Sequence, residues 1–447
     1  MPTSSYLLKG GTIVNQGKSF IADLLIEDSY ITRIDSNITH PGAQEINAEG
    51  LHILPGVIDD QVHFREPGLT HKANIGSEAT AAVAGGVTTF MEMPNTSPAA
   101  LTQELLQAKY DIAANTSPAN YSFFMGTSND NIEEVLRTDP KNVCGIKIFM
   151  GSSTGNMLVD NEKTLRTLFS QVSMLIAAHC EDEQTVKNNL ATARELYGDN
   201  IPANLHPVIR SAEGCLKSTA LAFQLAREYN TRFHLLHVST AIETELLSSH
   251  QSLEHKHITT EVCVHHLHFS EEDYARLGHL IKCNPAIKYT ADREALWKAL
   301  LDDRLDIIAT DHAPHTWNEK QQTYLQAPSG LPLVQHSLVM MLNKVREGKI
   351  SLEKVVEKMA HAPAICFRIA ERGFIKEGYK ADLAIVNLDS PWTVSKENIY
   401  YKCGWSPLEG DTMSAAVIHT FVSGQPALLN GRLQTNVRGE RLVFDRN

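Results

Sequence analysis

The sequence lacks the features that mark secreted and membrane proteins. Its seven cysteines are an odd number and include no Cys-x-x-Cys pair, which is typical of reduced thiols and not of a disulfide framework. No apolar run approaches the roughly 20 residues of a membrane span, and the opening residues lack the apolar core of a secretory signal. We therefore expect a cytoplasmic protein that does not enter a membrane.

Positive charge is scarce as well. The chain has 40 Lys and Arg against 52 Asp and Glu, a net charge of −12. Nucleic acids and anionic membranes both require a basic surface, so we expect a small-molecule substrate and no nucleic-acid partner. The length of 447 residues suits one large domain or two to three ordinary ones. Histidine is the abundant residue, with 20 copies that need an explanation.

Apolar, β-branched runs alternate with helix-like segments through the middle of the chain. The predicted strands are Ile53–His63, Val87–Met93, Tyr121–Met125, Gly145–Met150, Met174–His179, Arg232–Val238, Ile258–Cys263 and Leu305–Asp311. The predicted helices are Ile75–Ala84, Thr102–Ala114, Ile132–Thr138, Lys163–Gln171, Ser211–Tyr229, Ile242–His250, Glu271–Leu277 and Asp292–Leu301. This alternation predicts an α/β fold, a (β/α)8 TIM barrel, with a doubly wound parallel sheet as the alternative.

Both ends of the chain have a different pattern, made of short strands split by turn residues. The C-terminal part contains Ser423-Gly424 and Asn430-Gly431, which are hairpin dipeptides. Neither end is long enough to close a good sheet alone. We therefore expect one small composite β-sandwich domain, built from residues 1–54 and 366–447, beside a barrel of residues 55–365. Two separate β appendages are the alternative.

Metal-ligand residue types recur where the predicted strands end. In a barrel of this kind, the C-terminal ends of the strands face the active-site mouth. These positions hold His63, Lys147, His179, His237 and Asp311. Imidazole and carboxylate are zinc ligands, and zinc lowers the pKa of bound water enough to supply hydroxide at neutral pH.

Each of these residues also has a plain structural explanation. A single His on an apolar strand is often satisfied by its neighbours, a Lys can reach the barrel rim, and Asp311 could cap a helix. Their coincidence at corresponding strand ends favours a metal site. A buried Lys147 can lose its proton, and the neutral amine can add CO2 to form a carbamate that behaves as a carboxylate.

Several motifs together resemble the amidohydrolase superfamily, and within it the monofunctional bacterial type of dihydroorotase. They are HFREPG (His63–Gly68), AGGVTTFMEMPNT (Ala84–Thr96), GIKIFMG (Gly145–Gly151), AAHCED, LHVST, EVCVHHL (Glu261–Leu267), KCNPAIK (Lys282–Lys288), ATDHAPH (Ala309–His315) and WSPLEG (Trp405–Gly410). The resemblance extends over nearly the whole chain. It implies a (β/α)8 barrel with a composite β domain, in agreement with the pattern above.

The resemblance also implies roles for individual residues. Lys147, N6-carboxylated by CO2, would bridge two zinc ions, with His179 and His237 on one and His63 and Asp311 on the other. Asp311 would also be the catalytic base and acid. The substrate carboxylate would be bound by Arg65, Asn95 and His315, and the ring by Asn284 and the backbone of Ser329 and Gly330. In some relatives an Asp a few residues downstream replaces the Lys, but that stretch here is Ser152–Asn156, which leaves Lys147 as the evident candidate.

The implied reaction is the reversible opening of the cyclic amide of (S)-dihydroorotate to N-carbamoyl-L-aspartate, a step of pyrimidine biosynthesis. Allantoinase and dihydropyrimidinase are the alternative enzymes, because they share the metal site and the cyclic amide chemistry. Arg65 and His315 favour a ring that carries a carboxylate. We expect a homo-oligomer such as a dimer, with a transcarbamoylase as a candidate partner.

One position departs from the family pattern. The usual His-x-His at the end of strand one is Gln61-Val62-His63 here, and a carboxamide oxygen is a weaker zinc ligand than imidazole. The second zinc could bind loosely through Gln61 or water, or the enzyme could use one zinc ion. A third outcome is a catalytically silent partner of a transcarbamoylase. The other site residues all remain, which favours an active enzyme.

Two further groups of histidines need a role. His265, His266 and His268 follow strand seven, which supplies no metal ligand in this arrangement, so we interpret them as structural or rim residues. His312 is expected to orient the loop after Asp311.

Overall fold

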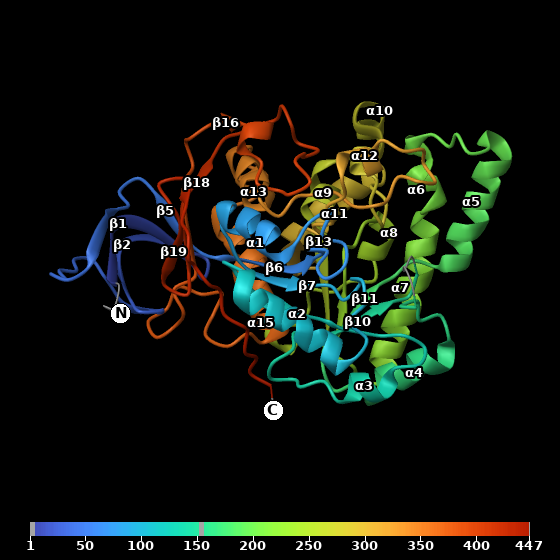
Figure 1. The fold of residues 1–447 in the computed structure, drawn as a ribbon, viewed down its shortest axis with the longest axis horizontal. Coiled ribbons are helices and arrows are strands. Elements are labelled where there is room, and N and C mark those ends of the chain that lie inside the picture. The colour runs from blue at the N-terminus through green and yellow to red at the C-terminus, as the bar shows by residue number, and fades with distance from the viewer. Residues whose placement is uncertain (1–4, 152–155, 447) are drawn as a thin grey trace.

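The computed structural model describes residues 5–151 and 156–446, so the stretch 152–155 discussed above lies outside the described residues. Figure 1 shows a barrel wrapped by helices, with a separate group of strands from both ends of the chain beside it. Within the described residues, no helix is long and apolar enough to cross a membrane.

Parallel strands form the barrel. A three-stranded sheet contains β6 (Val57–Val62), β7 (Val87–Glu92) and β8 (Asn120–Phe123). A six-stranded sheet contains β9 (Met125–Gly126), β10 (Ile146–Phe149), β11 (Ile176–His179), β12 (Phe233–Leu235), β13 (Ile258–Cys263) and β14 (Ile307–Ala309). Only Phe124 separates β8 from β9, so the two continue one another along the chain.

The barrel closes between its first and last strands. Val62 and His312 form a parallel bridge, and the His63 N–H donates to the His312 carbonyl over 2.7 Å. The (β/α)8 barrel is therefore confirmed, and the doubly wound sheet is wrong because an open sheet would leave these two edges apart.

Helices surround the barrel. The longer ones are α1 (Ile75–Ala84), α2 (Gln103–Thr116), α4 (Glu162–Gln171), α5 (Glu183–Tyr197), α7 (Ala212–Glu228), α11 (Thr290–Leu301) and α13 (Ser337–Arg346). The shorter α-helices are α3 (Ile132–Leu136), α6 (His206–Ile209), α8 (Ala241–Thr244), α9 (Val264–His268), α10 (Tyr274–Leu277), α12 (Trp317–Lys320), α14 (Leu352–Val356) and α15 (Ala362–Phe367). Single turns of 3-10 helix are η1 (Ala203–Leu205), η2 (Leu253–His255), η3 (Glu271–Asp273), η4 (Gly278–Ile281) and η6 (Lys396–Asn398), and η5 (Glu357–His361) is a π-helix.

Helix α5 was not predicted from the sequence. It is mostly polar, and only Val186 and Ala193 are buried on it, so its apolar stripe is weak. The Asp182 side chain caps its first turn by accepting from the Thr185 N–H, and Gly198 ends it with a φ of 61°. The predicted helix Ile242–His250 is shorter than expected, because only α8 is helical there.

The strands outside the barrel form a nine-stranded sheet. Its members are β1 (Ser5–Asn15), β2 (Lys18–Glu27), β3 (Tyr30–Asp35), β4 (Gln44–Asn47), β5 (His52–Pro55), β15 (Leu383–Asn387), β18 (Ala416–Val422), β19 (Gln425–Leu429) and β20 (Arg432–Leu433), and β16 (Trp392–Thr393) pairs separately with β17 (Thr412–Met413). β5 pairs with β1 on one side and with β15 on the other. The two ends of the chain therefore build one sheet, and two separate appendages are wrong.

The predicted strand Ile53–His63 is in fact two strands. β5 belongs to the terminal sheet and β6 to the barrel, and Gly56 lies between them. A Cβ at Gly56 would lie 2.2 Å from the Thr88 hydroxyl oxygen, so no larger residue fits where the chain passes from one sheet to the other. The continuous apolar pattern hid this division, and the domain limits of 54/55 and 365/366 stay a prediction.

A buried ion pair joins the terminal sheet to the barrel. The Arg372 guanidinium pairs with Asp382, and their side chains are 5% and 4% exposed. Asp382 also accepts from the Asn120 amide of β8 over 2.9 Å and from the Ser423 N–H over 2.7 Å. Arg372 further donates to Glu440 over 2.6 Å. The carboxylate of Asp382 therefore depends on Arg372 for its neutralisation.

We predict that Arg372→Met lowers the free energy of unfolding by about 3–5 kcal/mol, because it leaves the buried Asp382 charge uncompensated. The matched control is Arg33→Met, which breaks the exposed Arg33–Asp35 pair and is expected to change the unfolding free energy by less than about 1 kcal/mol. Urea unfolding followed by circular dichroism measures both. Equal effects of the two substitutions would contradict the prediction.

Candidate metal centre and its pocket

The site residues predicted from the sequence line one cavity at the C-terminal ends of the barrel strands. The cavity has a volume of about 340 Å³. It is lined by Gln61, His63, Arg65, Asn95, Lys147, His179, His237, Asn284, Asp311, His315, Ser329 and Gly330, together with Leu69, Lys72, Phe149, Ala313 and Pro328. Another cavity of about 350 Å³, beside α7 and β13, contains none of the predicted residues.

His179 and His237 face one another across two neighbouring strands. Nδ1 of His179 lies 2.9 Å from Nε2 of His237. Burial lowers the pKa of His179 although Glu181 opposes the shift, and burial with the nearby His179 and Lys147 lowers that of His237 further. Both rings are therefore neutral at pH 7. Two neutral imidazoles with converging nitrogens suit a shared metal ion.

A carboxylate behind His179 fixes the orientation of its ring. Nε2 of His179 lies 2.8 Å from Oε2 of Glu181, and Arg210 donates to the same oxygen over 2.6 Å. Burial raises the pKa of Glu181, but Arg210 and His179 outweigh it and hold this pKa well below its usual range. The ionised Glu181 therefore accepts a hydrogen bond from the Nε2–H of His179, which leaves the lone pair of this ring on Nδ1.

Sequence reasoning missed Glu181 and Arg210. The motif AAHCED contains Glu181, but Arg210 comes 29 residues later, after α5 and α6, and no sequence pattern indicates that the two side chains pair.

Lys147 is buried and its ammonium nitrogen lies 4.4 Å from the centre of the Phe149 ring. Within the described residues its Nζ makes no hydrogen bond or ion pair. Burial lowers the pKa of Lys147 to about 7, although Asp311 and Glu261 oppose the shift. A large fraction of this amine is therefore neutral at pH 7, which is the form that reacts with CO2.

His63, Asp311 and Gln61 form the opposite side of the candidate metal centre. Nε2 of His63 lies 3.0 Å from Oδ1 of Asp311, and Nδ1 of His63 lies 2.8 Å from Oδ1 of Asn95. Burial raises the pKa of Asp311, but the hydrogen bond and charge of His63 outweigh it and leave this pKa below normal. Asn95, predicted to bind substrate, therefore also orients His63.

Gln61 is turned away from a ligand role in this structure. Its amide nitrogen donates to Oδ1 of Asp311 over 3.2 Å, and its oxygen lies 3.9 Å from the Cys263 sulfur. The Gln61 amide NH2 therefore faces the candidate metal centre, and this group donates hydrogen bonds but has no lone pair to bind a metal.

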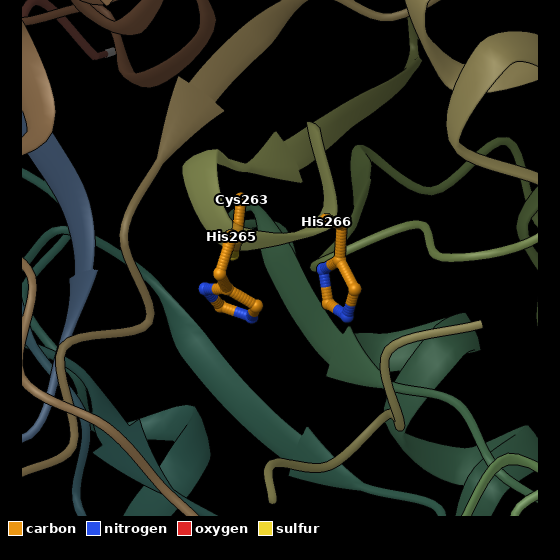
Figure 2. A group of neighbouring side chains, drawn as sticks. All are labelled: Cys263, His265 and His266. Atoms are coloured by element: carbon orange, nitrogen blue, oxygen red, sulfur yellow. The ribbon is translucent and has the colours of Figure 1, made fainter. Parts of the chain in front are cut away.

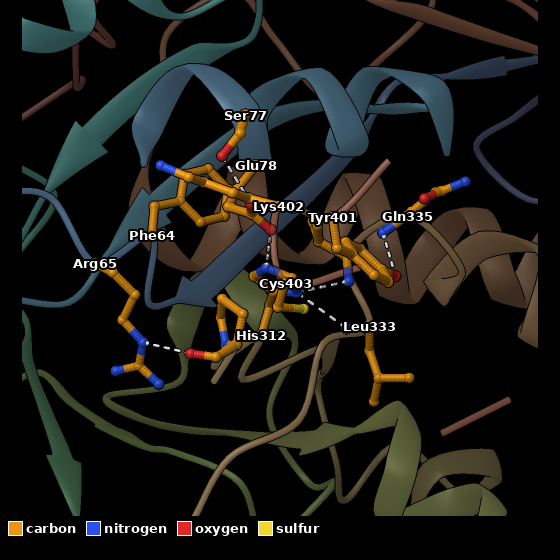
Figure 3. Close-up of polar contacts among 12 residues, drawn as sticks. Phe64, Arg65, Ser77, Glu78, His312, Leu333, Gln335, Tyr401, Lys402 and Cys403 are labelled. Atoms are coloured by element: carbon orange, nitrogen blue, oxygen red, sulfur yellow. Dashed lines mark hydrogen bonds and ion pairs between the residues drawn. The ribbon is translucent and has the colours of Figure 1, made fainter. Parts of the chain in front are cut away.

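The loop after Asp311 is held by His312, as predicted. Nδ1 of His312 accepts from the Leu333 and Val334 N–H groups, and its Nε2 lies 2.8 Å from Glu78 on α1. Figure 3 shows this contact beneath the Ser77–Glu78 turn and beside Tyr401 and Lys402. Asp311 itself has a φ of 47°, a strained left-handed backbone that these contacts maintain.

Basic groups gather at the other end of the cavity. Arg65 Nη2 lies 3.1 Å from His315 Nε2, and Lys72 donates to Nδ1 of His315 over 3.0 Å. Burial lowers the pKa of Arg65 to about 10, so it remains charged at pH 7. Sequence reasoning missed Lys72, which stands outside the HFREPG motif. This end of the cavity suits an anionic group.

The other three predicted substrate residues line the part of the cavity that is expected to hold a ring. The buried Oδ1 of Asn284 has no hydrogen-bond partner among the described residues. The segment of Ser329 and Gly330 is held from behind by Lys320, whose buried ammonium donates to the Pro328 carbonyl over 2.9 Å and the Gly330 carbonyl over 2.8 Å. A ring N–H could therefore be bound without moving the backbone.

Known proteins are similar to this chain over nearly its whole length. The model of the Amidohydrolase family matches residues 52–427. A dihydroorotase of Pyrococcus abyssi is 31% identical over 435 residues, with 97% of each chain covered. An allantoinase of Deinococcus radiodurans is 30% identical over 448 residues, with 98% of each covered. The L-hydantoinase (dihydropyrimidinase) structure from Arthrobacter aurescens has a TM-score of 0.93 at 24% identity, covering 98% of this chain and 99% of its own, and supports the fold alone.

We predict that Glu181→Gln weakens zinc binding by about 10–100-fold, because the neutral amide no longer polarises His179. The control is Glu195→Gln, an exposed change on α5 that should leave zinc affinity unchanged. Competition with a zinc-binding dye measures both variants. Unaltered zinc affinity in Glu181→Gln would show that the contact with His179 has no influence on the metal.

Proposed function

The chain belongs to the amidohydrolase family, and from this premise we propose that it is a zinc-dependent dihydroorotase. It would interconvert (S)-dihydroorotate and N-carbamoyl-L-aspartate, a step of pyrimidine biosynthesis. The observation that carries the proposal is that one cavity contains converging metal-ligand side chains and a basic end. Dihydroorotate has a cyclic amide, which would lie at the metal-ligand side chains, and a carboxylate, which would lie at the basic end.

The donor set suits a divalent metal. His179, His237 and a carboxylated Lys147 would hold it, because two neutral imidazoles and one anionic oxygen are a common zinc set. When bound, the metal would activate water and polarise the ring carbonyl. Among the described residues the buried amine of Lys147 has no hydrogen-bond partner, which supports carboxylation, since a carbamate would gain a metal ion as its partner.

Asp311 would carry the proton. Its carboxylate is ionised and lies beside His63 at the mouth of the barrel, so it can accept a proton from water and return it to the departing ring nitrogen. Arg65 and His315 would bind the substrate carboxylate, with Lys72 holding His315 in place. Asn284 and the Ser329–Gly330 backbone would bind the ring. Binding at both ends would place the amide bond between Asp311 and the metal ligands.

We propose that one zinc ion is sufficient. The Gln61 amide donates to Oδ1 of Asp311, so it occupies an oxygen lone pair that a second ion would need. The contact does not involve His179 or His237, so these two proposed ligands could still hold one ion.

Two other readings compete with this proposal. Similar proteins are named allantoinase and hydantoinase, so another cyclic amide is an alternative substrate. The basic end of the cavity favours a ring that carries a carboxylate over these alternatives. A catalytically silent partner of a transcarbamoylase is the second alternative, and the complete set of site residues in one cavity argues against it. A homo-oligomeric state, a transcarbamoylase partner and a cytoplasmic location stay predictions.

We predict that Arg65→Met raises the KM for dihydroorotate by about 100-fold or more, since a charge-assisted bidentate contact is lost. The kcat should change less than KM if Arg65 acts mainly in binding. Dihydrouracil, which lacks the carboxylate, provides the comparison substrate and should be a poor one for the wild type. Equal turnover of both substrates would contradict a dihydroorotase. Zinc-loaded wild type that is no faster than Asp311→Asn would instead support the silent partner.

We also predict that Gln61→His raises the zinc content by about one ion per chain over the wild type, because it restores an imidazole lone pair beside His63. Gln61→Asn is the matched control, since it keeps the amide and should leave the content unchanged. Elemental analysis after dialysis measures both. A Gln61→His protein with no more zinc than the wild type would contradict this explanation of the single catalytic ion.

A further inference from the structure

A second group of metal-ligand side chains lies at the end of β13, outside the cavity described above. It consists of Cys263, His265 and His266, one ligand atom of each lying within 4.8 Å of the others. The three residues are 0%, 0% and 3% exposed. Figure 2 shows the two imidazole rings side by side on α9, with Cys263 at the start of the same turn.

The hydrogen bonds of these histidines leave nitrogen lone pairs unused. Nε2 of His266 lies 3.1 Å from the Pro285 carbonyl, to which it donates its proton, so its lone pair is on Nδ1. That Nδ1 has no partner in the described part of the chain, and in Figure 2 it is turned toward His265. His265 has the Thr310 backbone as a polar neighbour, but neither of its ring nitrogens makes a hydrogen bond with a described residue.

The electrostatic surroundings favour a cation. Burial raises the pKa of the Cys263 thiol, and the nearby carboxylates of Glu261, Asp311 and Asp59 raise it further. Of these groups, Asp311 has a pKa below its usual range and is ionised, so its charge contributes a negative potential near the sulfur, which favours a divalent ion. An ion that binds would displace the thiol proton to solvent and leave a thiolate ligand.

We propose that Cys263, His265 and His266 form a second metal site, for a zinc-class divalent cation. One thiolate and two imidazoles are a zinc donor set, and the Gln61 oxygen, 3.9 Å from the sulfur, is a candidate fourth ligand atom. Zinc bonds of about 2.0–2.3 Å require small movements of the rings toward one another. The proposal gives His265 and His266 a role beyond the structural or rim role expected from the sequence, and the site does not depend on the proposed dihydroorotase activity.

The position of the new site explains the orientation of Gln61. Its amide nitrogen faces Asp311 and its oxygen faces Cys263, so this one side chain separates the two metal centres. An imidazole at this position would present only one lone pair and could serve only one of them.

Cobalt substitution tests the proposal, because a cobalt–thiolate bond gives an intense near-ultraviolet absorption and the catalytic donor set contains no sulfur. We expect this band when the apoprotein is loaded with Co²⁺. It should disappear in Cys263→Ser and fall at least tenfold in His266→Gln. Cys180→Ser is the control, because Cys180 follows the proposed ligand His179 but contacts Met150 through its sulfur and should not affect the band.

Zinc X-ray absorption on the folded wild type gives a second measurement that does not depend on a variant. We expect a sulfur scatterer at about 2.3 Å from zinc. The double variant with His179→Asn and His237→Asn should keep this sulfur signal while losing the catalytic ion. A metal-loaded wild type without the sulfur signal, a cobalt band that survives Cys263→Ser, or an apoprotein that takes up no cobalt would each overturn the proposal. Loss of dihydroorotate turnover alone would bear on the proposed function and not on this site.

Discussion

Closure of the barrel is the constraint on which the rest of the structure depends. The His63 N–H donates to the His312 carbonyl, and this bond joins the first strand to the last. It brings His63 beside Asp311 although 248 positions separate them in the sequence. Because the barrel strands are parallel, the same closure directs the ends of β10, β11 and β12 into one cavity. The candidate metal centre follows from this geometry.

Burial at the barrel mouth then sets the protonation of the site. It lowers the pKa values of His179, His237 and Lys147, so that these groups offer lone pairs at neutral pH. Asp311 is an exception, since the hydrogen bond with His63 keeps its carboxylate ionised in spite of burial. Neutral nitrogen donors and ionised oxygens are the forms that bind metal and transfer protons. The protein thereby prepares the site through desolvation and a few specific contacts.

Gln61 lies between the candidate metal centre and the Cys263 sulfur. A carboxamide has a donor end and an acceptor end, and this one uses the first on Asp311 and the second on Cys263. The substitution that looked like a damaged metal ligand in the sequence is therefore well bonded in the folded protein. Its amide nitrogen occupies a lone pair of Asp311 on one side, and its oxygen accepts from the Cys263 thiol on the other.

The sequence by itself determined the alternation of strands and helices, and hence the strand-end positions of His63, Lys147, His179, His237 and Asp311, because periodicity and residue type are local properties. The family resemblance added Arg65, Asn95, Asn284 and His315, and all of them line the cavity. Only the tertiary structure decided that Ile53–His63 is two strands in two sheets, and that Arg210 neutralises Glu181 behind His179. It also placed the side chains of Cys263, His265 and His266 together. These features depend on contacts between distant segments and on side-chain orientation, which a linear pattern does not encode.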